Sequence, residues 1–531
     1  MGIKSLSSRN FNLVDQPWLP CRTAAGETRL FGLRDALVGS HGIRELRDGS
    51  PLVTAALHRL LLAVLHRVFG PADPDAWRAL WLAPALPSGP LEEYFARWRG
   101  RFDLLDERRP FYQTAGFATE APSGVNRLAQ ERARGNNPTL FDHTDDTDPP
   151  ALSPAEAARL VVAEQAFAVG GGKSATGNTT HAPLVGGAAV LPLGAALRET
   201  LLLNLVTYDA SERPVPADGD VPFWERDRDG GPPLERMPAS PDGYLDLLTW
   251  QSRTLRLHVE DLDGRPVVRR VSYAQGRRFA PPPGLFDPAF AIRRSSDGDR
   301  AIRLAEDRGV WRDSAALFQF AAADEFLGPL VLRELAERRP DVEGLRPACE
   351  TAVIGLCTDK AKVNFWRHER LPLPLAYLAD AQLVADLKTA LALAESVAVV
   401  LRSAVRTAAR TALSPADPSR ADKDRVSQLA DSLAPERLYW SRLEEPFRRL
   451  LTDLPAADRT ERLREWFEAV LRRQARGAFE RTAGELDSSA RACRAAVEGE
   501  AALLRGLAAL RFENPYRHIF PQTQEAASAA T

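Results

Sequence analysis

The chain has 531 residues and a formal net charge of −2, and 44% of its residues are hydrophobic and 26% are charged. This composition is typical of a soluble globular protein and excludes a fibrous or disordered chain. Because domains usually contain about 100–200 residues, the length predicts roughly two to four domains. No run reaches about 18 uninterrupted apolar residues, so we expect no transmembrane helix and no membrane partner.

The N-terminus and the cysteines indicate a cellular location. The first ten residues, MGIKSLSSRN, lack the apolar core of a signal peptide. The cysteines form no C-x-x-C pair, so neither a disulfide framework nor a cysteine zinc site is predicted. We therefore expect a reducing, cytoplasmic environment. The cysteines are Cys21, Cys349, Cys357 and Cys493.

The charge distribution predicts that any nucleic-acid binding is local, because the whole chain is nearly neutral. Of the 69 basic residues, only six are lysines. A lysine kept in an arginine-rich chain is a candidate for a tight site that needs a compact ammonium, and chance is the alternative. The lysines are Lys4, Lys173, Lys360, Lys362, Lys388 and Lys423.

The first hundred residues predict one short hairpin and two helical regions. The extended run FNLVDQPWLP at 11–20 is bounded by prolines and fits a strand and hairpin. Apolar residues then recur at helical spacing over 51–69, and a tryptophan-rich helical region covers 71–98.

Residues 130–150 are rich in Gly, Asn, Asp and Pro, which predicts a loop of about twenty residues. Loops of that length are uncommon in compact domains and are usually functional or disordered. Phe141 lies in the middle of this loop as a large apolar residue. It is either an anchor into a partner or a local packing residue, and both interpretations remain open.

A helix is predicted to begin after Ser153, because Pro154 suits its first position and Glu156 completes a capping box. The three glycines at 170–172 end that helix. Farther along, TLRLHV at 254–259 and VRRVSY at 268–273 alternate apolar and polar residues. The dipeptide Asp263-Gly264 between them predicts a β-hairpin.

The last part of the chain changes in composition. Residues 355–374 mix charges, lysines and aromatics and are interpreted as an ordered loop beside a packed element. Beyond residue 376 the chain is rich in Ala, Leu, Arg and Glu, and short connections favour an antiparallel four-helix bundle. We therefore expect an α+β protein, with a mixed α/β domain over 1–375 and a helical bundle over 376–531. The helical stretches run roughly over 378–412, 423–453, 457–482 and 485–511.

The sequence partly matches several catalytic and metal-binding motifs, but each match lacks a residue or a spacing that the motif requires. Phe167 stands where a P-loop ending in Gly172-Lys173-Ser174 requires glycine. Thr176 replaces the last glycine of a nucleophile elbow. His368-Glu369 lacks the second histidine of H-E-x-x-H. The acidic run at 142–148 lacks the glycine and spacing of a calcium loop.

Two groups of residues remain as candidates for binding. Gly170, Gly171 and Gly172 beside Lys173 would let a backbone approach a groove or a phosphate, with a helix stop and flexible linker as the alternative. Arg402, Arg406 and Arg410 recur at i, i+4 and i+8, where like charges destabilise an isolated helix. They predict either a polyanion or acidic neighbours from other helices of the bundle.

Several of these segments together resemble CasA, the large subunit of the type I-E CRISPR surveillance complex Cascade. The resemblance spans nearly the whole chain, including the C-terminal bundle. It rests on the order and spacing of its segments, since no single motif is highly specific. The segments are FNLVDQPWLP at 11–20, FAVGGGKS at 167–174, LRETLLLNL at 197–205 and FWRHERL at 365–371.

The resemblance implies roles for particular residues. The family's glycine loop corresponds to Gly170–Gly172, and its basic finger to Arg278 with Arg277 as a neighbour, although the family has lysine there. Its wedge, which splits the duplex and usually carries glutamine, corresponds to Asp359-Lys360-Ala361. Phe141 corresponds to the aromatic of a loop that docks on the guide RNA and neighbouring subunits. No metal and no cofactor are implied.

The resemblance also implies a function. Such a subunit is not an enzyme; it recognises the short duplex motif beside the target, the PAM, from the minor groove, where the donor and acceptor pattern is degenerate. Guide pairing supplies the remaining specificity. The implied partners are guide-RNA-containing subunits, double-stranded DNA and a helicase-nuclease that is recruited later. Two other hypotheses are a stand-alone nuclease or ATPase, and a helical adaptor without a nucleic-acid role.

Overall fold

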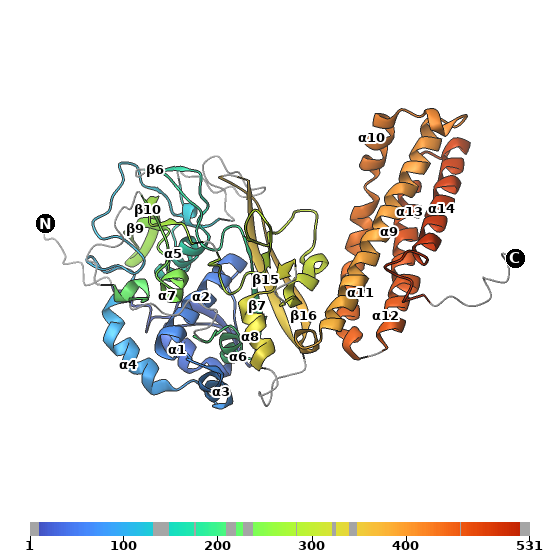
Figure 1. Cartoon of the computed structure of the whole chain (residues 1–531). Coiled ribbons are helices and arrows are strands. Elements are labelled where there is room, and N and C mark those ends of the chain that lie inside the picture. The colour runs from blue at the N-terminus through green and yellow to red at the C-terminus, as the bar shows by residue number, and fades with distance from the viewer. Residues whose placement is uncertain are drawn as a thin grey trace. The chain divides into compact units, whose positions relative to one another are not determined.

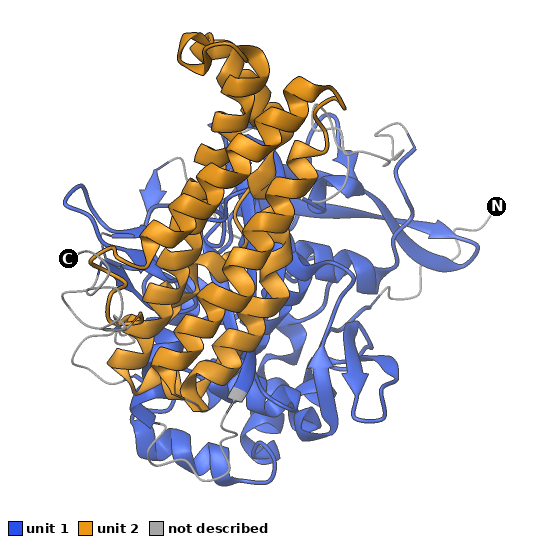
Figure 2. Cartoon of the chain, turned by 90° about the vertical axis from the view of Figure 1, so that its right-hand side faces the viewer, with its two compact units in different colours: residues 1–306, 320–370 blue, residues 307–319, 371–531 orange. Residues whose placement is uncertain are grey.

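The computed structural model describes residues 10–130, 148–174, 177–208, 219–226, 237–282, 284–320, 325–338, 348–359, 361–456 and 458–520. The chain divides into two compact units, which Figure 2 shows in different colours. Unit 1 comprises Met1–Glu306 and Phe320–Arg370, and unit 2 comprises Asp307–Gln319 and Leu371–Thr531. The segment 307–319, which the sequence-based boundary placed in the first domain, therefore belongs to the helical unit.

The core of unit 1 is built on two helices, α2 (Pro51–Val68) and α5 (Pro154–Phe167). By length and composition α2 could cross a membrane, but 78% of it is buried inside the protein, as in a core helix. The predicted capping box of α5 is confirmed. Ser153 Oγ accepts from the Glu156 amide, and the Glu156 carboxylate accepts from the Ser153 amide.

The N-terminal residues form a small antiparallel sheet with strand order β2-β1-β3. The strand and hairpin predicted for residues 11–20 lie farther along the chain: only Leu19 and Pro20 of that run belong to β1, which pairs with β2, and residues 11–18 form a turn with one isolated bridge. The tryptophan-rich region is helical as expected. Trp18 and Trp77 are fully buried and anchor this part to the core. The elements are β1 (Leu19–Thr23), β2 (Thr28–Phe31), α1 (Leu33–Val38), β3 (Ile43–Leu46), α3 (Pro74–Leu82) and α4 (Ser88–Trp98).

A long hairpin, β9 (Arg253–Leu262) and β10 (Arg265–Gln275), confirms the predicted turn. Asp263 and Gly264 both adopt positive φ, 53° and 79°, which is the backbone of a type I′ turn and explains why glycine follows aspartate here. The strands extend beyond the predicted ranges, which covered only 254–259 and 268–273.

The segment 355–374 is not a loop, so that expectation is wrong. It forms the end of β15 (Ala348–Asp359) and most of β16 (Lys362–Pro374), in a sheet of order β16-β15-β7 with β7 (Ala188–Leu193). Along β16 the burial alternates with period two from residue 362 to 369. Charged residues occupy both faces, so no hydrophobic alternation marked the strand in the sequence.

Unit 1 also contains further short helices and a set of two-residue strands. They are α6 (Leu197–Leu203), α7 (Tyr244–Leu248), α8 (Leu330–Arg338), β4 (Ser123–Gly124), β5 (Lys173–Ser174), β6 (Gly177–Asn178), β8 (Pro238–Ala239), β11 (Arg278–Phe279), β12 (Ile292–Arg293), β13 (Arg300–Ala301) and β14 (Phe326–Leu327).

Unit 2 is a helical bundle, and all four predicted helical stretches are confirmed (Figure 1). The second stretch is broken at Ala434, which has a φ of 41° and precedes a proline. The third contains a π-helical turn, Trp466–Leu471. The helices are α9 (Ala381–Leu413), α10 (Lys423–Leu433), α11 (Pro435–Asp453), α12 (Arg459–Glu465), α13 (Arg472–Ala483) and α14 (Ala490–Leu510).

Ion pairs explain why residues 307–319 belong to the bundle. Arg308 and Arg312 both pair with Glu395 of α9, at 2.9 and 2.8 Å. The Arg312 guanidinium also lies 3.7 Å from the centre of the Trp440 ring on α11, in a cation–π contact. These contacts connect segments that are far apart in the sequence, so sequence periodicity alone does not reveal them.

A buried polar network holds the C-terminal end of α5 against the β9–β10 hairpin. Arg253, 1% exposed, donates to Tyr273 Oη at 2.6 Å and to the Val169 carbonyl at 2.9 Å. Tyr273 in turn donates to Glu164 Oε1 at 2.5 Å. Gln130 donates to the other Glu164 oxygen. Each of these polar side chains therefore has a partner inside the core.

Removing one member of this network should cost much of the stability of unit 1. We expect Arg253→Met to lower the free energy of unfolding by about 3–5 kcal/mol, because it leaves the Glu164 carboxylate buried without its cation. The double variant Glu164→Gln/Arg253→Met should recover part of that loss. Guanidinium denaturation of the full chain measures both. A single-variant cost below about 1 kcal/mol would contradict the role assigned to the network.

Candidate nucleic-acid interface

The three consecutive glycines enter a small hairpin at the end of α5. The helix ends at Phe167, and β5 then pairs antiparallel with β6, with Lys173 opposite Asn178. The Gly171 amide donates to the Thr179 carbonyl at 2.7 Å, and the Thr179 amide donates to the Gly172 carbonyl at 2.8 Å. The described residues of this segment, 170–174 and 177–179, therefore form a hairpin, which we call the glycine hairpin.

The three glycines serve different purposes. A Cβ on Gly170 would lie 2.6 Å from backbone atoms of Thr180 and His181, so only glycine fits there. Gly171 has a φ of +94°, a conformation that side chains with Cβ rarely adopt. Gly172 has room, since its added Cβ would lie 3.6 Å from Thr179 Oγ1.

The glycine amides are already bonded inside the protein, which corrects the expectation of exposed amides ready for a phosphate. Gly170 N–H donates to His181 Nδ1 at 3.0 Å, and Gly172 N–H donates to Thr179 Oγ1 at 3.1 Å. Burial and the nearby cations Arg253 and Arg303 lower the pKa of His181, which suits a neutral ring that accepts a hydrogen bond. The glycines therefore let another group come close to the backbone, but they do not offer free N–H donors.

Gln275, at the end of β10, fastens the glycine hairpin to the β9–β10 hairpin. Its side-chain oxygen accepts from the Thr180 amide at 2.6 Å. Its backbone amide donates to Ser174 Oγ at 3.2 Å, and Ser174 Oγ donates to the Gly177 carbonyl at 2.7 Å. Sequence reasoning missed Gln275, Thr179 and His181, because a lone glutamine, threonine or histidine carries no pattern that reveals its partners.

Arg277, predicted as a neighbour of the DNA-binding finger, is engaged inside the protein. Its side chain is largely buried, pairs with Asp246 at 2.6 Å and lies 3.8 Å over the Trp250 ring. Arg278 differs, because it makes no ion pair within the described part of the chain. Its guanidinium lies beside the glycine hairpin, 3.3 Å from the position a Cβ would take on Gly177.

The tip of the β15–β16 hairpin reaches the glycine hairpin. Ala361 lies against Gly171, with its Cβ 3.1 Å from the position of a Cβ on that glycine. Asp359 ends β15, and Ala361 is exposed in the turn that leads into β16. Lys360 lies outside the described residues. Lys173, on the glycine hairpin, is exposed. Three segments that are far apart in the sequence thus meet at one place.

The other candidate residues lie apart from this place. Phe141 lies outside the described residues. Arg402 pairs with Glu436 of α11 at 2.5 Å, so an acidic neighbour accounts for one of the three bundle arginines. Arg406 and Arg410 are exposed on α9 and make no ion pair among the residues that the structure describes.

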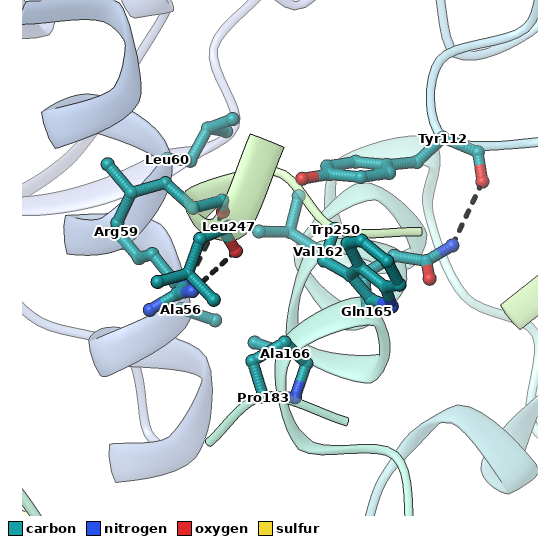
Figure 3. Close-up of a pocket in the computed structure, with 11 residues that line it drawn as sticks. Ala56, Arg59, Leu60, Tyr112, Val162, Gln165, Ala166, Pro183, Leu247 and Trp250 are labelled. Atoms are coloured by element: carbon teal, nitrogen blue, oxygen red, sulfur yellow. Dashed lines mark hydrogen bonds between the residues drawn. The ribbon is translucent and has the colours of Figure 1, made fainter. Parts of the chain in front are cut away.

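A small pocket lies between α2 and α5, and Figure 3 shows its lining. Arg59 donates to the carbonyls of Leu247 and Leu248, at 2.5 and 3.1 Å, and pairs with Asp287. Gln165 donates to the carbonyl of Tyr112. These polar side chains bind other parts of the protein, so we interpret the pocket as a gap in the packing of the core and not as a binding site.

Comparison with known proteins identifies the family. The family model described as CRISPR-associated protein Cse1 matches residues 12–478. The CasA/Cse1 protein of Thermus thermophilus is 34% identical over 509 residues, which cover 93% of this chain and 96% of that protein. A crystal structure of CasA from the same organism matches with a TM-score of 0.79 and 31% identity, over 94% of this chain and 100% of that one.

A further solved structure, described as a CRISPR RNA-guided surveillance complex, shares the fold with a TM-score of 0.73 at 23% identity, over 93% of this chain and 99% of that one. The match along the sequence and the shared fold place the chain among CRISPR-associated proteins. Within that class it belongs to the CasA/Cse1 family, and the resemblance drawn from the sequence segments is confirmed.

The glycine hairpin predicts a contrast between two conservative substitutions. Gly170→Ala places a methyl group against the Thr180 backbone and should destabilise unit 1 by roughly 1–3 kcal/mol, the usual cost of overpacking. Gly172→Ala has space and should stay within about 0.5 kcal/mol of wild type. Thermal melts of the two full-length variants test this. Equal melting temperatures for the two variants would contradict the packing described here.

Proposed function

We propose that this protein is the non-catalytic large subunit of a type I-E CRISPR surveillance complex. In this role it recognises the PAM in double-stranded DNA from the minor groove, helps start target unwinding, and recruits the helicase-nuclease. The observation that supports the proposal is the meeting of Gly171, Arg278 and the β15–β16 tip in one place, within a member of the CasA/Cse1 family.

The chemistry of this place suits a short duplex motif. Arg278 and Lys173 supply cations that have no ion-pair partner among the described residues, beside a backbone that carries no Cβ at Gly171, so a groove edge can approach closely. Minor-groove readout is degenerate, and a surface of this kind would tolerate several related motifs. In this proposal Asp359 and Ala361, which flank the tip of the β15–β16 hairpin, act where the first base pair opens.

Association with guide RNA and other subunits is the second part of the proposal. A protein that shares its fold belongs to an RNA-guided surveillance complex, and the near-neutral charge of this chain suits a subunit whose partners carry most of the DNA binding. The loop that contains Phe141 is our candidate for docking on the guide RNA and the neighbouring subunits.

The first test separates motif recognition from general DNA binding. Gly171→Asp should weaken binding to a duplex that carries the motif by about ten-fold or more, because it adds a side chain and a negative charge against the tip of the hairpin. Binding to a target that is already unwound should change little. Fluorescence anisotropy with the assembled complex measures both affinities.

Gly172→Ala is the matched control, since its added methyl group has room. It should bind both DNA substrates as the wild type does. Equal loss of Gly171→Asp on both substrates, with an unchanged melting temperature, would argue against a role in motif recognition.

The second test concerns the exposed arginines of α9. If Arg406 and Arg410 contact phosphates of a displaced strand, replacing both with glutamine should reduce the slope of log Kd against log salt concentration by roughly 1–2, because fewer counterions are released. Arg402→Gln is the control, because this side chain is already paired with Glu436. An unchanged slope for the double variant would assign these arginines to a protein neighbour or to solvent.

A further inference from the structure

We propose that the exposed face of β16 binds the single DNA strand that is released at the tip of the β15–β16 hairpin, with Trp366 stacking on one of its bases. This inference rests on the proposed function, because it takes the tip as the point of strand opening. The face consists of Lys362, Asn364, Trp366 and His368, which alternate along the strand.

One side of β16 is fixed to the protein, which leaves the other side free to bind. Arg367 donates to the carbonyls of Ala305 and Glu306, both at 2.9 Å, and its guanidinium lies 5.1 Å from the Phe365 ring. Residues 363, 365, 367 and 369 are partly buried, whereas residues 362, 364, 366 and 368 are exposed. Because successive side chains of a strand point to opposite faces, the four exposed side chains share one face.

The exposure of Trp366 calls for an explanation. Ten tryptophans occur in the chain, all of them described, and Trp366 is the one whose side chain lies among the exposed large hydrophobic residues, at 41%. An exposed aromatic ring on a rigid strand is suited to stacking with a flat partner. Every nucleic-acid base offers such a partner, and stacking of this kind tolerates any sequence.

The charge of the face favours a polyanion. Lys362 is exposed and makes no ion pair within the described residues, and the four alternating positions carry no carboxylate. The carboxylate of Glu369 belongs to the opposite face, where it lies 3.5 Å from Arg367. Although its side chain is exposed, partial desolvation of its ring, together with the nearby cations Arg370 and Arg47, lowers the pKa of His368, so at neutral pH it contributes a flat ring and hydrogen-bonding groups rather than charge.

The position of the face suits a strand that leaves the tip. Lys362 directly follows Ala361, which contacts Gly171 of the glycine hairpin. At about 3.3 Å per residue, Trp366 lies roughly 13 Å farther along β16 than Lys362. A strand separated at the tip would therefore meet the ammonium first and the tryptophan ring next, which is the order of a basic groove with an aromatic platform.

The experiment uses the full chain and four fluorescent DNA probes. They are an intact duplex that carries the motif, the same duplex with the motif scrambled, a motif-bearing fork with one unpaired arm beginning beside the motif, and the unpaired arm alone. Trp366→Ala should weaken binding to the fork by about ten-fold, the usual scale for losing one stacked base, and leave binding to the intact duplex unchanged. Trp366→Phe should lose less, because a ring remains. Phe512→Ala, at a 60% exposed aromatic in unit 2, is the matched control and should have no effect.

The outcomes separate this inference from the function on which it rests. A wild type that does not prefer motif duplex over a scrambled duplex would defeat the proposed function. If that preference holds and Trp366→Ala binds the fork like wild type, only the present inference is wrong. Equal loss on fork and duplex would also overturn it, by assigning Trp366 to the duplex site. The same variant is also measured in the assembled complex. If Trp366→Ala releases a protein subunit there and leaves fork binding intact, β16 is an edge for pairing with another protein, and the inference is overturned.

Discussion

The arrangement of the candidate interface depends on one buried ion pair and its hydrogen bonds. Arg253 and Glu164 are both inaccessible to solvent, and Tyr273 joins them by accepting from one and donating to the other. A buried charge is tolerated only when its hydrogen bonds are complete, so this network leaves the end of α5 little freedom. Arg253 also binds the Val169 carbonyl, immediately before the first of the three glycines. The direction in which the glycine hairpin leaves the core is therefore set inside the core.

This constraint on the end of α5 allows segments that are far apart in the sequence to meet at the glycine hairpin. The glycine hairpin is tied to β10 through Gln275, and a missing Cβ at Gly171 lets Ala361 approach it. The amides of Gly170, Gly171 and Gly172 are held by internal hydrogen bonds, so recognition would fall to close backbone approach and to side chains such as Arg278.

Electrostatics divides the arginines into two groups. Arg277 and Arg402 are occupied by Asp246 and Glu436, and they hold elements together. Arg278, Arg406 and Arg410 make no ion pair among the described residues. In a chain whose net charge is −2, attraction for a polyanion has to come from such positions rather than from overall charge. The number of basic residues in the sequence does not distinguish the two groups, because pairing depends on neighbours that are distant in sequence.

The sequence by itself determined the local structure that depends on neighbouring residues. Periodicity predicted the bundle helices, Ser153 and Glu156 predicted a cap, and Asp263-Gly264 predicted a turn, since each signal spans only a few residues. Family membership also followed from the sequence, through segments in a particular order. Only the tertiary structure decided that 355–374 is a strand hairpin, that Arg277 is buried, and that Gly171 meets Ala361. Those outcomes depend on ion pairs, hydrogen bonds and packing between residues that are far apart in the sequence. A local sequence pattern does not reveal which of these residues meet.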